Sequence, residues 1–143
     1  MAIIRTATTT WEGNLSSGEG RVNLDTSEQG TFDVTWKARA EEADYKTSPE
    51  ELIAAAHSSC FSMALSHALG EAGYTAEEIR TSASVSFVPG EGIKGSELSL
   101  SARIPGIEDE EFQRLAQGAK DGCPVSLALA GIEITLKAEL IQA

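Results

Sequence analysis

The stretch TSPEELIAAAHSSCFSMALSHALG, residues 47–70, decides the fold. Ser48 can cap a helix, Pro49 suits the first helical position, and a glutamate three residues after Ser48 completes a capping box. We predict a helix from about Pro49 to Leu69, ended by one of the glycines that follow it. Because the segment is apolar or small on every face, the sequence predicts a buried central helix.

Strand patterns flank this helix on both sides. Residues 3–39 carry β-branched and aromatic side chains between turn-like glycines, which predicts three antiparallel strands. After the helix we expect a second strand pair around a turn at residues 89–92, an amphipathic helix from about Glu108 to Lys120, a short helix opened by Cys123 and Pro124, and a last strand. This order does not alternate as βαβ, so the sequence predicts an α+β fold.

Composition limits the size of the protein and its partners. With 143 residues and 41% hydrophobic content, the chain can form one compact domain over residues 1–143. Eleven basic and 22 acidic side chains give a net charge of −11. Such a charge repels nucleic acid and anionic membrane surfaces, so neither is an expected partner.

The expected compartment is the cytoplasm, because the first residues show no secretory signal. Residues 52–69 lack charged side chains and are long enough to suggest a membrane span, but their histidines, serines and alanines make them too polar and too small. In the cytoplasm, paired cysteines are more often catalytic, redox-sensing or metal-binding than structural. No CxxC pair or zinc-type cluster is present, so no metal is expected.

Cys60 lies in the middle of the predicted helix. A cysteine there is most often inert packing, and burial raises the pKa of a thiol, so a reactive Cys60 needs a nearby cation or hydrogen-bond donor. The helix dipole acts only within about the first turn and does not reach it. Residues distant in the sequence must supply the charge, and the local sequence does not choose among Arg5, Arg21, Arg39, Arg80, Arg103 and Arg114.

His57 stands three residues before Cys60 and shares its helix face. A cysteine–histidine pair is typical of thiol hydrolases, in which the imidazole takes the proton and the thiolate attacks a carbonyl. The sequence shows neither an oxyanion-hole motif nor a third orienting group, and a histidine on a buried helix is usually just hydrogen-bonded. A Cys60/His57 hydrolase therefore remains an alternative.

Cys123, before Pro124, lies at a predicted helix start, where backbone N–H groups favour a thiolate. This position suits an attacking thiol and a resolving thiol equally well. Together the cysteines suggest a cycle in which one thiolate attacks a peroxide to give a sulfenic acid and the other condenses with it to a disulfide. The alternatives are a redox switch without turnover and two unrelated buried cysteines.

Two motifs resemble those of the OsmC/Ohr family of thiol-dependent peroxidases: residues 47–66 and the GCPVS element at residues 122–126. The resemblance spans the whole chain, from the early residues 11–13 to the ending at residues 132–136. His57 in the first motif and the Cys-Pro-Val-Ser form of the second are more similar to the osmotically inducible OsmC branch than to the organic hydroperoxide resistance branch.

The resemblance implies an OsmC-like fold, with antiparallel sheets packed around a long buried central helix. It also implies an intertwined homodimer with two active sites at the subunit interface. Each site would reduce organic hydroperoxides, and hydrogen peroxide less efficiently, without flavin, haem or metal. The implied role is defence against oxidative or osmotic stress.

By the same resemblance, Cys60 is the peroxidatic cysteine and Cys123 the resolving one. Arg39 would hold the thiolate, and Glu50 would orient the guanidinium. From the residues alone, Arg39 is a surface cation at a strand end and Glu50 an exposed first-turn glutamate. The family's reductants are dithiols, lipoyl-bearing partners among them, and apolar side chains line its thiol pocket.

Overall fold

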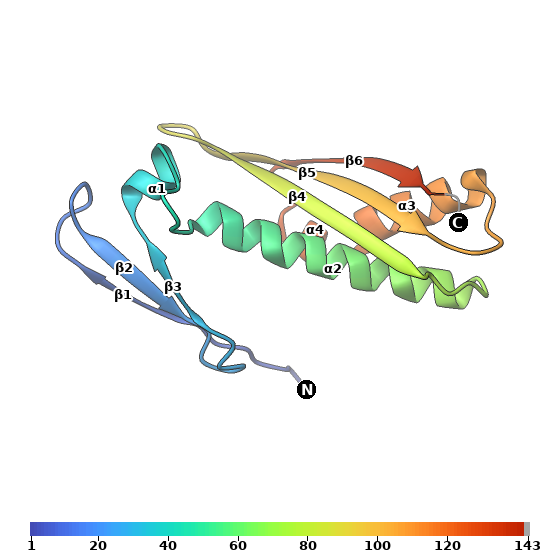
Figure 1. Cartoon of the computed structure of the whole chain (residues 1–143), viewed down its shortest axis with the longest axis horizontal. Coiled ribbons are helices and arrows are strands. Elements are labelled where there is room, and N and C mark those ends of the chain that lie inside the picture. The colour runs from blue at the N-terminus through green and yellow to red at the C-terminus, as the bar shows by residue number, and fades with distance from the viewer. Residues whose placement is uncertain (142–143) are drawn as a thin grey trace. The chain divides into compact units, whose positions relative to one another are not determined.

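A computed structural model describes residues 1–141 of the chain. The order of helices and strands confirms the α+β class, with one helix that the sequence does not predict. The chain forms two compact units, one over Met1–Leu52 and one that begins at Ile53. Figure 1 shows the elements coloured from blue at the N-terminus to red near the C-terminus.

The first unit contains a three-stranded antiparallel sheet in the order β1-β2-β3, as predicted. Its strands are β1 (Thr8–Glu12), β2 (Glu19–Asn23) and β3 (Thr31–Val34). Gly20 of β2 lies opposite Trp11 and Val34. A Cβ at Gly20 would stand 2.7 Å from the Trp11 ring and 2.9 Å from Val34 Cγ2, so the packing of these two side chains requires glycine.

A short helix, α1 (Trp36–Ala40), follows the sheet. The sequence predicts strand through Trp36 and a strand end at Arg39, and this prediction is wrong. The hydroxyl of Thr35 accepts a hydrogen bond from the Ala38 N–H at 3.0 Å and caps the helix. Because α1 has only five residues, it is too short to show a helical hydrophobic period.

Helix α2 (Pro49–Glu71) has the predicted start. The Ser48 hydroxyl accepts a hydrogen bond from the Glu51 N–H at 3.2 Å, while the Glu51 carboxylate accepts from the Thr47 hydroxyl. At the other end, the Tyr74 N–H bonds the Leu69 carbonyl at 2.8 Å around Gly73, which adopts the positive φ of 91° that favours glycine. The helix therefore runs two residues beyond the predicted Leu69.

One face of α2 is buried within the second unit and the opposite face is exposed in the single chain. His57, Phe61, Leu65 and Leu69 are each at most 1% exposed, whereas Met63 is 71% exposed. The expected burial on every face is therefore not reached within one chain. By length and apolar content, α2 could also cross a membrane. Its exposed face, however, carries polar side chains, namely Ser59, Ser66 and His67.

The second unit contains a three-stranded sheet in the order β4-β5-β6. Strands β4 (Glu78–Val88) and β5 (Gly92–Arg103) form the predicted antiparallel hairpin, but β6 (Glu133–Leu140) pairs with β5 in parallel. The expectation of purely antiparallel sheets is wrong for this pair. Helices lie between β5 and β6 in the chain, and such a crossover allows the second strand to run in the same direction as the first.

Those connecting helices are α3 (Asp109–Gly122) and α4 (Pro124–Ala128), both close to the predicted bounds. Cys123 is the junction between them: it ends α3 and caps α4. The core of the unit joins one face each of α2, β5 and α3, and its most buried members are Phe61, Leu65, Leu69, Leu98, Leu100, Ala102, Phe112 and Ala116.

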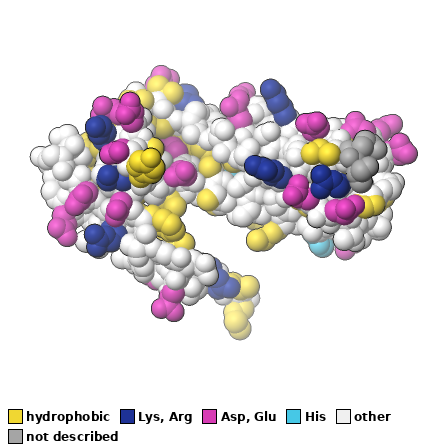
Figure 2. Space-filling model, viewed as in Figure 1, with side chains coloured by type: hydrophobic (Ala, Val, Ile, Leu, Met, Phe, Trp, Pro, Cys, Tyr) yellow, Lys and Arg dark blue, Asp and Glu magenta, His cyan; other side chains and the backbone are white. Residues whose placement is uncertain are grey.

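Charged side chains are distributed rather than clustered on the face shown in Figure 2. Asp and Glu side chains (magenta) spread over it, with Lys and Arg (dark blue) between them. The acidic side chains on this face belong to a sequence whose net charge is −11.

Phe112→Ala should lower the free energy of unfolding by about 3–5 kcal/mol, because the change leaves a cavity in the core. The Phe112 side chain is 0% exposed. The control Phe112→Leu keeps most of the volume and should lose less. Chemical denaturation followed by circular dichroism measures both variants, and equal stability of Phe112→Ala and the parent protein would contradict the assigned core.

Candidate functional site

The two cysteines meet within the second unit. The Sγ atoms of Cys60, in the middle of α2, and Cys123, at the start of α4, are 3.0 Å apart, although 63 residues separate them in the chain. Both are free thiols. A disulfide bond needs about 2.05 Å between the sulfurs, so only a short movement separates this arrangement from a bonded pair.

The two thiols differ in their exposure to solvent. Cys123 is 0% exposed, whereas Cys60 is half-buried and lines a pocket of about 570 Å³. A small molecule in this pocket can therefore reach Cys60 but not Cys123. The pocket wall is largely apolar and includes Met63, Ala64, Ala68, Leu115 and Pro124.

The surroundings of Cys123 favour its thiolate. Burial alone raises the pKa of this thiol, but hydrogen bonds from the Cys60 thiol, from the Ser126 hydroxyl and from backbone N–H groups outweigh burial, and the net pKa is lowered. The N–H groups belong to Val125 and Ser126 in the first turn of α4. The predicted helix start at Cys123 is therefore present and acts as expected on this thiol.

The pKa of the Cys60 thiol shifts in the opposite direction, upward. Burial raises the pKa of its thiol, and the hydrogen bond with Cys123 raises it further, against a smaller lowering by the Val125 N–H. None of these interactions in the described part of the chain involves a cation. A reactive Cys60 therefore needs a charge beyond these interactions, and Arg114 is the cation of the second unit that lines the same pocket.

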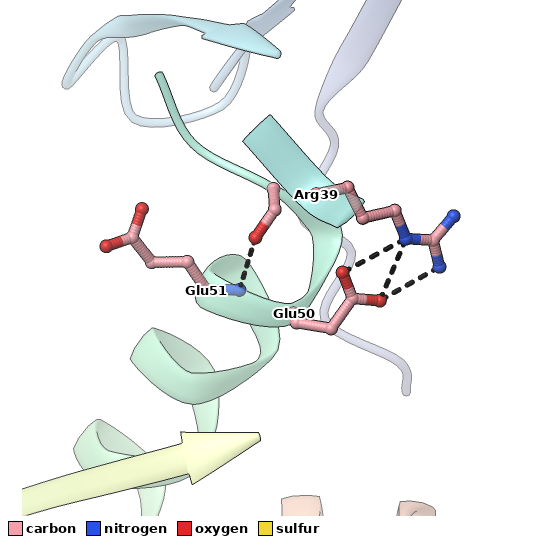
Figure 3. Close-up of polar contacts among 4 residues, drawn as sticks. Arg39, Glu50 and Glu51 are labelled. Atoms are coloured by element: carbon pink, nitrogen blue, oxygen red, sulfur yellow. Dashed lines mark hydrogen bonds and ion pairs between the residues drawn. The ribbon is translucent and has the colours of Figure 1, made fainter. Parts of the chain in front are cut away.

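Arg39 and Glu50 form a bidentate ion pair within the first unit (Figure 3). Arg39 Nε lies 3.0 Å from Glu50 Oε1, and Arg39 Nη2 lies 2.8 Å from Oε2. Arg39 projects from α1, and Glu50 lies in the first turn of α2. Glu50 is only 6% exposed, so it is not the solvent-exposed glutamate that local sequence suggests.

The Arg39 guanidinium lies beside an apolar pocket of about 370 Å³ in the same unit. Its carbon Cζ is 6.0 Å from the centre of the Trp36 ring, within the range of a cation–π contact. The aromatic and aliphatic members of the wall are Trp11, Leu15, Val22, Val34, Trp36 and Leu52. The first unit therefore presents a cation at the edge of an apolar surface.

His57 does not act on Cys60 in this structure, although the two share a helix face. Its ring is 0% exposed, with Nδ1 2.7 Å from Ser96 Oγ and Nε2 2.8 Å from Ser126 Oγ. Burial lowers the pKa of the imidazole and keeps it neutral. Both ring nitrogens are thus engaged by serines, which does not support the hydrolase alternative.

The serines are the part of this region that sequence reasoning misses. Ser126 lies three residues after Cys123 in the GCPVS motif, so the motif could have indicated it. Ser96 comes from β5, and nothing in the sequence connects it to His57. Among residues 1–141, no group of three or more His, Cys, Asp or Glu side chains could hold a metal ion.

Comparisons with known proteins agree with the fold and the motifs. A model of the family described as OsmC-like protein matches residues 40–137. The peroxiredoxin OsmC of Escherichia coli (strain K12) is 42% identical over 133 residues, which cover 91% of this chain and 92% of that protein. The organic hydroperoxide resistance protein OhrA of Bacillus subtilis (strain 168) is 30% identical, covering 88% and 86% of the two chains.

A solved structure extends the similarity to three dimensions. The organic hydroperoxide resistance protein of Elizabethkingia anophelis superimposes with a TM-score of 0.72 at 32% identity, over 99% of this chain and 100% of that one. The fold and the family match therefore assign the protein to the class that includes peroxiredoxin OsmC and the organic hydroperoxide resistance proteins. The chain belongs to the OsmC-like family.

Proposed function

We propose that the protein is a peroxidase of the peroxiredoxin type that reduces organic hydroperoxides, and hydrogen peroxide less efficiently. The observation that carries the proposal is the pair of thiols 3.0 Å apart, of which only Cys60 lines a pocket. The names of the relatives, a peroxiredoxin and organic hydroperoxide resistance proteins, support the same activity. The proposed role is defence against oxidative or osmotic stress.

In the first step, the Cys60 thiolate attacks the terminal oxygen of the peroxide. An S–O bond forms, the O–O bond breaks, and the alkoxide leaves as an alcohol after taking a proton. Sulfur is oxidised to a sulfenic acid and the peroxide is reduced. Accessibility supports this role for Cys60, because Cys123 is fully buried.

In the second step, the Cys123 thiolate attacks the sulfur of the Cys60 sulfenic acid. The S–S bond forms, the S–O bond breaks, and hydroxide leaves as water after protonation. The short distance between the sulfurs and the lowered pKa of Cys123 support this step. A dithiol then reduces the disulfide and is itself oxidised to a disulfide, and the resemblance implies lipoylated proteins among such reductants.

Arg39 and Glu50 are proposed to activate Cys60. The raised pKa of Cys60 means that its thiolate needs a cation or a hydrogen-bond donor to stabilise it. A guanidinium held by a buried carboxylate is a rigid, permanently charged donor, which suits the stabilisation of a thiolate. In the homodimer that the resemblance implies, with active sites at the subunit interface, Arg39 would provide this charge and Glu50 would orient it.

The apolar pocket walls support organic peroxides as substrates. Met63, Leu115 and Pro124 lie beside Cys60, and aromatic rings lie beside Arg39. Burial of an alkyl or aryl group contributes about 25 cal/mol per Å² of apolar surface, a gain that hydrogen peroxide cannot make. The exposed face of α2 is consistent with the proposed dimer.

We further propose a cytoplasmic protein that forms a single domain and needs no cofactor, nucleic acid or membrane. The family match over residues 40–137 crosses the junction between the two units, which supports one functional domain. The net charge of −11 opposes binding to nucleic acid or anionic lipid. A redox switch without turnover would use the same thiols, and steady-state kinetics separates it from a peroxidase.

With dihydrolipoamide as reductant, the purified protein should consume cumene hydroperoxide with a higher kcat/KM than hydrogen peroxide. Cys60→Ser should abolish turnover with little loss of stability, because it replaces one sulfur by oxygen. Coupled steady-state assays of both proteins measure this. Consumption of a single equivalent of peroxide without turnover would instead indicate the switch, and hydrolysis of activated esters would indicate the hydrolase.

Cys123→Ser should still reduce one equivalent of peroxide but leave Cys60 open to oxidation to the sulfinic acid, because no second thiol traps the sulfenic acid. Mass spectrometry of the protein after stepwise addition of cumene hydroperoxide measures the added oxygen atoms. If this variant cycles with dihydrolipoamide at the parent rate, Cys123 is not the resolving cysteine.

A further inference from the structure

A chain of three buried polar side chains leads to Cys123. Ser96 of β5 contacts His57 Nδ1 at 2.7 Å, and Ser126 of α4 contacts His57 Nε2 at 2.8 Å. Ser96 and His57 are 0% exposed and Ser126 is 5% exposed. Ser126 lies in the first turn of α4, which begins directly after Cys123, and its hydroxyl is among the groups that lower the pKa of the Cys123 thiol. These hydrogen bonds thus join β5, α2 and the first turn of α4, next to the cysteine that faces Cys60.

The number of available protons limits the direction in which the hydrogen bonds among Ser96, His57 and Ser126 can run. A neutral imidazole has one N–H donor and one acceptor nitrogen, and each serine hydroxyl has a single proton. A thiolate at Cys123 can only accept. If Ser126 donates its proton to this thiolate, the Ser126 oxygen must accept from the ring N–H at Nε2. Nδ1 then accepts the proton of the Ser96 hydroxyl.

The opposite direction has a different effect on the sulfur. If Nδ1 carries the ring proton, Nε2 accepts the Ser126 proton, and the hydroxyl no longer donates to Cys123. That arrangement removes a donor from the thiolate. Only the Nε2–H tautomer therefore leaves the Ser126 hydroxyl free to donate to a charged Cys123 while Ser96 and both ring nitrogens of His57 keep their hydrogen bonds.

We propose that His57 is a positioning residue for the resolving step: held by Ser96 as the Nε2–H tautomer, it aims the Ser126 hydroxyl at Cys123 and favours the thiolate form of that cysteine. This inference rests on the proposed function only in taking Cys123 as the resolving cysteine. The effect of His57 on the Cys123 thiol can be measured without peroxide. A hydrogen bond to a charged group contributes enough to change a thiolate population about tenfold.

The other ionisable groups near Cys123 lie outside the hydrogen-bonded series of Ser96, His57 and Ser126. The Cys60 thiol of α2 faces it at 3.0 Å, and α4 carries no ionisable side chain. In the last turn of α3, Lys120 and Asp121 pair with each other at 3.7 Å. His67 and Arg114 line the pocket on which Cys60 opens.

The test titrates the Cys123 thiolate by its ultraviolet absorbance in a Cys60→Ser background, where it is the only cysteine. His57→Phe should move the titration to higher pH and reduce the thiolate population at neutral pH about tenfold. His57→Gln, which keeps an amide donor near the position of Nε2, should restore most of it. The control is Ser62→Ala, which removes a hydroxyl of the same helix that bonds Thr81, and it should leave the titration unchanged.

A double variant separates positioning from general damage. If His57 acts through Ser126, then Ser126→Ala should shift the titration as His57→Phe does, and combining the two should add no further shift. Additive shifts, or a shift with Ser126→Ala but none with His57→Phe, would overturn the proposal. If His57→Phe does not fold by circular dichroism, Ser96→Ala decides: it should shift the titration in the same direction, and no shift would overturn the proposal.

In the protein with both cysteines, stopped-flow kinetics should show the effect of His57→Phe mainly on disulfide formation and not on the first attack by Cys60. If the parent protein reduces no peroxide, the proposed function fails, but the titrations still decide whether His57 controls the Cys123 thiolate.

Discussion

The contact between the Cys60 and Cys123 sulfurs is the constraint on which the rest of the site depends. It requires the middle of α2 to meet the exact start of α4, and the local sequence provides for both. The buried face of α2 fixes the helix on the sheet through Phe61 and Leu65. Cys123 ends α3 and caps α4 before Pro124, which holds its backbone at a defined junction.

The two thiols differ in both solvent exposure and pKa. Cys60 is reachable but lies where burial raises its pKa, whereas Cys123 is unreachable but has donors that lower its pKa. A peroxide can therefore meet only the thiol that needs outside activation. The buried pair of Arg39 with Glu50 is the cation that we propose for this purpose, and the serine–histidine chain has the corresponding role at Cys123.

The sequence predicts the elements with strong local signals and misses those set by distant contacts. The capping of α2 at Ser48 and the helix start at Cys123 are confirmed because both depend on neighbouring residues. Helix α1 is missed because five residues show no period, and the parallel pairing of β6 is missed because a crossover has no local signature. Ser96 could not be foreseen, since only the fold brings β5 to His57.

We propose that Cys60 and Cys123 of the same chain form the redox pair. The most direct measurement adds one equivalent of cumene hydroperoxide to the fully reduced protein and maps disulfides by peptide mass spectrometry without reduction, using mixed light and isotopically heavy chains. We expect a Cys60–Cys123 disulfide in which both peptides come from one chain. Light–heavy linked peptides, or oxidised Cys60 with Cys123 still a thiol, would contradict it.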